Sequence, residues 1–202
     1  MKIAGVVLAG GLSTRMGKDK AQLLLAQQTL LSRAVLLLES LCLENVFVSG
    51  QYRGFSCIAD LHQESGPLAG LHACAESLFG QYDALFIMAV DMPLLSEKEC
   101  RHLLEIYLQH PQGVFFDFVT FPMILPLNKV LKEYLAETLV SPDKKQRSLY
   151  RLLKTLNIQP VNYLAEDGFR FQNSNTPEQW HECQTTYAQL IARRSLEKDK
   201  ED

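Results

Sequence analysis

Short apolar runs alternate with longer amphipathic segments over the first half of the chain. Four runs have the length and composition of strands: 2–8, 45–49, 55–59 and 84–90. Three longer segments have the length of helices: 29–43, 66–79 and 96–109. The run 84–90 is apolar throughout, which is typical of a central parallel strand buried on both faces. The alternation predicts an α/β fold in which a doubly wound, mostly parallel sheet lies between two layers of helices.

The second half of the chain has a different pattern. Further strands are expected at 113–119, 121–127 and 160–164, and helices at 128–140 and 146–157. A last helix is expected after Thr176 as N-cap, with Pro177 at its first position. Because no repeat or low-complexity linker divides the chain, residues 1–192 are expected to form one domain. The charged segment 193–202 is expected to be a frayed tail.

Composition narrows the class of protein. The 202 residues are 47% hydrophobic and 21% charged, which is enough apolar surface for one core. The net charge of −3 disfavours a nucleic-acid partner, which would select a basic surface. The five cysteines lie far apart without a C-x-x-C pair, and neither a signal peptide nor a membrane-spanning segment is recognisable. A cytoplasmic protein with no membrane partner is expected.

The stretch Leu8 to Lys20, Leu-Ala-Gly-Gly-Leu-Ser-Thr-Arg-Met-Gly-Lys-Asp-Lys, directly follows the first expected strand. It contains three glycines, three cationic side chains and two hydroxyls. Glycines let backbone N–H groups approach an anion, and the cations supply charge, so the composition favours a phosphate-binding loop. The stretch fits neither the P-loop pattern nor G-x-G-x-x-G. A glycine-rich surface turn with incidental charges is the alternative.

This loop resembles the nucleotidyltransferase signature L-A-G-G-x-S-x-R-M-G-x-D-K, in the form found in the molybdenum cofactor guanylyltransferase (MobA) family. Three further stretches resemble motifs of that family, in order: 65–73 (SGPLAGLHA), 89–95 (AVDMPLL) and 171–180 (FQNSNTPEQW). The resemblance spans nearly the whole chain. It implies a Rossmann-like nucleotidyltransferase fold and an enzyme that transfers GMP from GTP to the terminal phosphate of Mo-molybdopterin, releasing pyrophosphate.

The glycines favour guanine within this superfamily. Cytidylyltransferase relatives usually carry alanine at the position of Gly10 and lack the segment 66–70. Removing a methyl group from the loop would give a purine room near backbone donors and acceptors. The resemblance implies GTP contacts from Leu8, Ala9, Gly10, Gly11, Lys20, Ser49, Asp60, Gly66, Pro67, Leu68, Ala69, Gly70 and Asp91.

The resemblance assigns catalysis to three residues. Asp91 follows the apolar run 84–90, and the family match makes it the ligand of Mg²⁺, with Mn²⁺ as the alternative ion. Without that match, Asp91 could simply cap the turn before Pro93. Lys20 and Arg15 match family residues that contact the phosphates, where their charge would stabilise the leaving group. The acceptor phosphate is largely a dianion at neutral pH, with a second pKa of about 6, so no catalytic base is expected.

Other candidates depend on the resemblance more heavily. Asp60 matches a family aspartate that contacts the nucleotide, although a plain turn aspartate is equally compatible. Ser49 stands where some relatives carry a nucleotide-contacting asparagine. Asn173 and Asn175 match asparagines that approach the metal or the second substrate, and Asn175 could also simply precede the Thr176 cap. Arg147 matches an arginine near the pterin site only loosely.

The segment 112–126 departs from the family pattern. It is shorter than in relatives, and Phe121 stands before Pro122 where a histidine or arginine is frequent. Its phenylalanines fit a packed strand or an apolar wall for a pterin. Because this region faces the second substrate in relatives, the acceptor stays open.

Two alternatives therefore remain at this point. One is another nucleotidyltransferase on the same scaffold, acting with CTP on molybdopterin or on a sugar phosphate. The other is a non-catalytic module that binds a nucleotide or hands over the cofactor. The resemblance also implies protein partners that insert molybdenum or mature molybdoenzymes.

Overall fold

The computed structural model describes residues 1–10, 19–60, 66–163 and 165–198, and a seven-stranded sheet crosses the centre of this part of the chain. Its order is β5-β4-β1-β6-β8-β7-β9. The strands are β1 (Ile3–Leu8), β4 (Asn45–Ser49), β5 (Cys57–Ile58), β6 (Ala84–Ala89), β7 (Val114–Phe116), β8 (Met123–Pro126) and β9 (Gln159–Val161). Only β8 pairs antiparallel to its neighbours within this sheet, so the expected mostly parallel fold is confirmed.

The direction of strand addition reverses around β1. The chain moves from β1 to β4 and β5 on one side, then crosses to β6 on the other side. Leu8 at the end of β1 is level with Ser49 of β4 and with Ala89 of β6. Three parallel strands therefore end at the same edge of the sheet, which is where ligands bind in open α/β folds.

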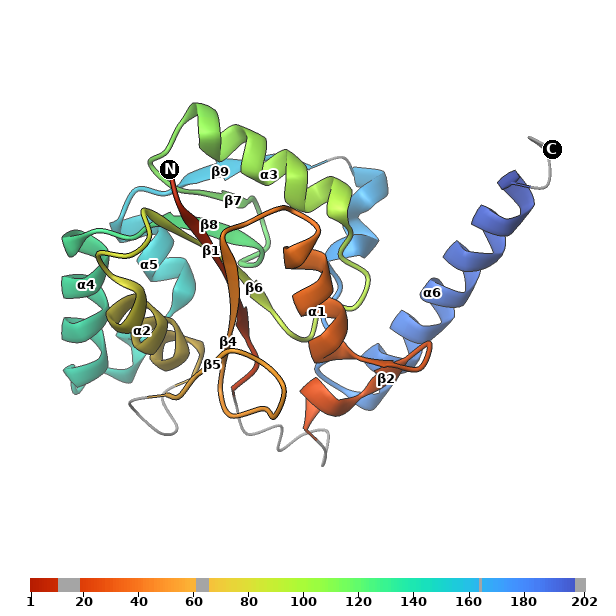
Figure 1. Ribbon diagram of the computed structural model, residues 1–202, viewed down its shortest axis with the longest axis horizontal. Helices are drawn as coiled ribbons and strands as arrows, with labels where there is room; N and C mark the ends of the chain where they lie inside the picture. The colour runs from red at the N-terminus through yellow and green to blue at the C-terminus, as the bar shows by residue number, and fades with distance from the viewer. Residues whose placement is uncertain (11–18, 61–65, 164, 199–202) are drawn as a thin grey trace.

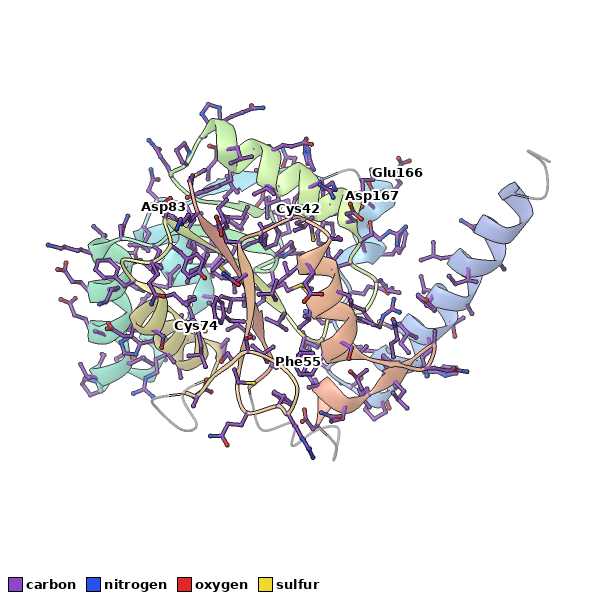
Figure 2. The ribbon with its side chains drawn as sticks, in the orientation of Figure 1. Cys42, Phe55, Cys74, Asp83, Glu166 and Asp167 are labelled. Carbon is purple, nitrogen blue, oxygen red and sulfur yellow. The ribbon has the colours of Figure 1, made fainter. Side chains whose placement is uncertain are left out.

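Helices cover both faces of the sheet (Figure 1). They are α1 (Leu30–Glu39), α2 (Pro67–Leu78), α3 (Glu97–Gln109), α4 (Lys129–Val140), α5 (Leu149–Thr155) and α6 (Pro177–Lys198). Buried side chains of α1 and α3 pack in one core with Ile3 and Val7 of β1, whereas those of α2, α4 and α5 pack with Ala4 and Val6. This alternation along β1 places the sheet between two apolar layers. Side chains fill both layers, among them the fully buried Cys74 of α2 (Figure 2).

Local capping explains where several helices begin. The Thr29 hydroxyl accepts the Ser32 N–H ahead of α1, and Pro67 occupies the first turn of α2. Ser96 and Glu99 form a capping box at α3. Thr176 accepts the Gln179 N–H at the start of α6, as the sequence predicts.

Several boundaries differ from the expectation. Helix α1 ends at Glu39 rather than near 43, since Cys42 takes a left-handed conformation. The sequence pattern suggests a longer helix because the buried Leu41 prolongs the run of apolar residues. The strand expected at 55–59 shortens to two residues. A small hairpin, β2 (Leu24–Leu25) with β3 (Gln28–Thr29), was not expected. Helix α6 continues to Lys198, inside the segment expected as a frayed tail, and Figure 1 shows it projecting away from the sheet.

Three short 3-10 turns complete the described chain: η1 (Lys20–Gln22), η2 (Lys144–Gln146) and η3 (Ala165–Phe171). Among the described residues, none of the helices has the length and apolarity needed to cross a membrane.

Candidate active site

A cavity of about 490 Å³ opens at the carboxyl ends of β1 and β6. The cavity is lined by the end of β1 and the residues that follow it, Leu8, Ala9 and Gly10, and by the end of β6 and the residues that follow it, 89–92. Its remaining walls come from more distant parts of the chain: Lys20, Pro67, the segment 118–121, Leu149, Phe171, Asn173 and Asn175. The cavity thus gathers pieces of all four sequence motifs at the point where strand order reverses.

Lys20, Asp91 and Asn175 form one polar cluster in this cavity. The Lys20 Nζ donates to Asp91 Oδ2 at 2.9 Å and to Asn175 Oδ1 at 2.5 Å. The Lys20 and Asp91 side chains are each 17% exposed, so bulk water screens the ion pair only partly. Asp19 holds Lys20 in place, because its carboxylate caps η1 by accepting the Ala21 N–H at 3.0 Å.

Ser174 attaches the motif 171–180 to Asp91. Its backbone N–H donates to the Asp91 carbonyl at 2.9 Å, and its hydroxyl donates to the same oxygen at 3.3 Å. Ser174 is fully buried. These two bonds place the flanking Asn173 and Asn175 beside Asp91, although more than eighty residues separate the two segments.

A second polar cluster lies where β4 and β5 end. The Ser49 hydroxyl donates to Asp60 Oδ1 at 2.8 Å. A Cβ added at Gly10 would stand 2.9 Å from Asp60 Oδ2, and one added at Gly70 would stand 2.2 Å from Ser49 Oγ. The Asp60 carboxylate therefore occupies the space beside Gly10, and the Ser49 hydroxyl bonded to it occupies the space beside Gly70. This differs from the expectation that Gly10 leaves room for a purine, because a carboxylate of the protein lies in that space.

Tyr52 connects the two described ends of the glycine-rich loop. Its hydroxyl donates to the Ala9 carbonyl at 3.0 Å, and Asp19 Oδ1, at 3.4 Å, is a second acceptor for the same proton. Burial, and secondarily the nearby Asp19 carboxylate, raise the pKa of Tyr52 above its ordinary value, so the phenol remains a donor even in alkaline solution. Gly50 makes room for this ring, because a Cβ there would stand 2.8 Å from Tyr52 Cε2. No motif or periodic pattern in the sequence marks Tyr52 as part of the site.

Replacing Tyr52 with phenylalanine is expected to weaken GTP binding about 5- to 10-fold while leaving the fold intact. The change removes the hydroxyl proton that these two acceptors share, a loss of roughly 1 kcal/mol, but keeps the packed ring. Calorimetric titration with GTP measures the effect. The matched control is Tyr134→Phe on α4, which lies on the other face of the sheet and is expected to bind GTP normally. Normal GTP affinity in the Tyr52 variant would show that the loop does not need this anchor.

Comparison with known proteins agrees with this geometry. The model of the MobA-like NTP transferase domain matches residues 5–161. The chain belongs to the MobA-like NTP transferase family. It is 40% identical over 178 residues to a molybdenum cofactor guanylyltransferase of Xanthomonas euvesicatoria pv. vesicatoria, an alignment that covers 87% of this chain and 91% of the relative. A molybdenum cofactor guanylyltransferase of Rhodobacter capsulatus is 30% identical, with 88% and 93% covered.

A solved structure shares the fold of this MobA-like protein. It is the molybdopterin-guanine dinucleotide biosynthesis protein A from Archaeoglobus fulgidus, which superposes with a TM-score of 0.68 at 18% identity and covers 92% of this chain and 99% of its own. Family membership and the curated relatives together make the protein a nucleotidyltransferase. Transferase activity in molybdenum cofactor biosynthesis is supported by the names of the relatives.

Several residues that the sequence analysis named as candidates either do not line the cavity or lie outside the described residues. Gly11 and Arg15 lie outside the described residues. Leu68, Ala69 and Gly70 are buried in the first turns of α2, while Gly66 precedes that helix with a φ of +68° that favours glycine. Arg147 does not line the cavity. Its guanidinium donates to the Leu139 and Ser141 carbonyls, so the structure gives it a role at the end of α4.

The oxygen atoms that the site offers as ligands suit a divalent metal ion only when other ligands join them. Among the described residues no group of three or more His, Cys, Asp or Glu side chains could hold an ion by itself. The Asp91 carboxylate and the Asn175 amide oxygen are hard oxygen ligands that already share one cation, the Lys20 ammonium. This set suits a divalent ion that takes its remaining ligands from nucleotide phosphates and water.

Proposed function

We propose that the protein transfers GMP from GTP to the terminal phosphate of molybdopterin, forming the guanine dinucleotide cofactor and pyrophosphate. The observation that carries the proposal is that Lys20 donates to both Asp91 and Asn175 at the reversal point of the sheet. The curated relatives that bear the name molybdenum cofactor guanylyltransferase support the choice of nucleotide and acceptor.

Asp60 is the proposed reader of the base. Guanine presents two adjacent donors, N1–H and the 2-amino group, and a carboxylate can accept both. Cytosine lacks this pair. Ser49 uses one lone pair of Oδ1, which leaves acceptor capacity on both carboxylate oxygens. The two glycines beside Asp60 support this role because they allow the carboxylate to lie close to the loop backbone.

The triphosphate is proposed to lie between β1 and β6. Lys20 would donate to its oxygens, and the N-terminus of α2, which begins at the cavity with Pro67, adds partial positive charge. Asp91, together with Asn173 or Asn175, would hold Mg²⁺ or Mn²⁺ when the nucleotide is bound. Such an ion neutralises phosphate charge and fixes the orientation of the α-phosphate.

The reaction needs positioning and charge more than proton transfer. An oxygen of the acceptor phosphate forms a bond to the α-phosphorus of GTP while the bond from that phosphorus to the bridging oxygen breaks, and pyrophosphate leaves with the electron pair. The acceptor arrives largely as a dianion, so no base is required.

The decisive test combines purified protein, Mg²⁺, molybdopterin and one nucleoside triphosphate at a time, with pyrophosphate release as the measurement. Release is expected with GTP and not with CTP, ATP or UTP. Reactions without molybdopterin and reactions with EDTA are the controls. Turnover with CTP but not GTP would falsify the assignment of the base.

Nucleotide preference can also be measured through stability. A ligand that binds only the folded state adds about 2.7 kcal/mol at a concentration of 100 Kd. Mg²⁺–GTP is therefore expected to raise the unfolding temperature by several degrees, and Mg²⁺–CTP at the same concentration to raise it much less. Equal shifts with the two nucleotides would contradict guanine selectivity.

A further inference from the structure

Phe118 is the most exposed large apolar side chain among the described residues, at 90% exposure. It lies in the turn between β7 and β8, and it lines the cavity that holds Asp91. Exposure of a whole phenyl ring to water is unfavourable. An aromatic side chain that is exposed at the wall of a polar cavity therefore indicates a ligand that covers it.

The turn holds Phe118 in a defined position. Its φ of +65° lies in the left-handed region, which aromatic residues rarely adopt. Asp117 fixes this conformation, since its carboxylate accepts the Phe118 N–H at 3.0 Å and its own N–H donates to the Val161 carbonyl at 2.8 Å. The Val119 N–H donates to the Phe116 carbonyl at 3.3 Å. The side chain is thus displayed by a hydrogen-bonded turn at the end of the sheet.

The strand order separates Phe118 from the base-reading cluster. Asp60 lies against Gly10, just beyond β1, whereas Phe118 follows β7. Between β1 and β7 lie β6 and β8, so three strand spacings of about 4.8 Å place the two strands about 14 Å apart. Asp91 follows β6 and therefore stands between them. With guanine at Asp60 and phosphates near Asp91, Phe118 faces the side from which the acceptor must approach.

The cavity wall that contains Phe118 is mostly apolar. The hydrophobic residues Val119, Phe121, Leu149 and Phe171 line the same cavity, and Thr120 is the polar residue of the segment 118–121. The polar residues Lys20, Asn173 and Asn175 line the cavity as well. The acceptor therefore meets both an apolar surface and groups that bind phosphate.

We propose that Phe118 is the stacking surface for the fused, nitrogen-containing ring system of the acceptor, and so a specificity-determining residue for the second substrate. The inference rests on the proposed function and deepens it. Flat heteroaromatic rings stack on exposed aromatic side chains, with gains comparable to those of nucleobases on single-strand binding proteins. Binding of such a ring removes the phenyl group from water, whereas a sugar phosphate offers no flat aromatic face.

The test measures binding of a stable pterin phosphate, dihydroneopterin monophosphate, to the full chain by calorimetric titration. Phe118→Ala is expected to weaken binding at least about tenfold, and Phe118→Trp to retain it, because stacking needs an aromatic face. The matched control is Tyr150→Ala on α5, an aromatic residue that is 68% exposed but does not line the cavity. Its affinity for the probe is expected to equal that of the unmodified chain, and GTP affinity is expected to be unchanged in all three variants.

A second readout does not depend on affinity alone. The chain contains one tryptophan, Trp180, so Phe118→Trp adds an indole whose fluorescence can be measured against that background. The pterin phosphate is expected to quench the added fluorescence, and GTP is expected to leave it nearly unchanged. Quenching by GTP instead would place Phe118 in the nucleotide half and overturn the proposal.

Failure of this inference and failure of the proposed function give different results. If the unmodified protein transfers GMP to molybdopterin and Phe118→Ala has the same KM for molybdopterin, the stacking role is wrong and the function stands. If Phe118→Ala loses the pterin probe but the unmodified protein turns over only with CTP, the guanylyl assignment is wrong and the stacking role stands. Absence of any pterin binding to the unmodified protein overturns the stacking role directly.

Discussion

Replacing Asp91 with asparagine is expected to lower the rate of pyrophosphate release about 10³-fold without unfolding the protein. The substitution keeps the shape of the side chain and an oxygen that can accept from Lys20, but it removes the negative charge that balances the ammonium and would bind a divalent ion. Loss of one preorganised charged group in a partly dehydrated site typically costs 10²- to 10³-fold in rate. Steady-state kinetics with GTP and molybdopterin measure the loss.

The matched control lies at the other end of the same strand. Asp83 immediately precedes β6 and lies in space beside the N-terminus of the chain (Figure 2). Its carboxylate accepts the Lys2 N–H at 2.6 Å. Asp83→Asn removes the same charge at the amino edge of the sheet, so transfer is expected to be unchanged. A similar loss in both variants would indicate a general effect on folding. Full activity of Asp91→Asn would remove Asp91 from the mechanism.

The sequence predicts the convergence of the first and third motifs well. A short β-branched run before Gly10 and the apolar run before Asp91 both have the character of buried parallel strands, and such strands end at one edge. Alternation of strands and helices was sufficient to place the loop and Asp91 beside each other. No alignment of distant residues was needed for this part of the site.

Other parts of the site depend on contacts that leave no local pattern. Asn175 shares Lys20 with Asp91 because Ser174 is buried against the Asp91 carbonyl, and a single buried serine has no periodic signature. Tyr52 acts through one hydroxyl and could not be distinguished from a surface tyrosine. Arg147 shows the opposite case, since a resemblance in sequence suggested the pterin site and the guanidinium instead binds carbonyls at the end of α4.

The cluster of Ser49 and Asp60 shows how composition and geometry combine. The sequence argument took Gly10 as a sign of a larger base, and the structure adds that Asp60 fills the space beside it. Gly70 serves Ser49 in the same way. Both glycines thus act on the position of one carboxylate, and this dependence can be tested by restoring a methyl group.

Gly70→Ala is expected to reduce GTP affinity about ten- to hundredfold and to reduce the preference for GTP over CTP. The new Cβ would stand 2.2 Å from Ser49 Oγ and 3.3 Å from Asp60 Oδ1, so Ser49 must move and the Asp60 carboxylate must follow. Overpacking of this kind costs about 1–3 kcal/mol. Calorimetric titration with both nucleotides measures affinity and preference together. Gly168→Ala is the control, because the nearest described atom to its Cβ would be Tyr163 Cε2, at an ordinary 3.7 Å.

A compensating substitution separates this steric effect from general damage. Ser49→Gly removes the hydroxyl and the Cβ that the new methyl group would meet, and it also removes the hydrogen bond to Asp60. The double variant is therefore expected to bind GTP more tightly than Gly70→Ala and about as well as Ser49→Gly alone. Such coupling between neighbouring sites is the sign of direct contact. If the two losses simply add, the collision is not the cause, and Gly70 must act on the nucleotide by another route, such as direct backbone contact with the base.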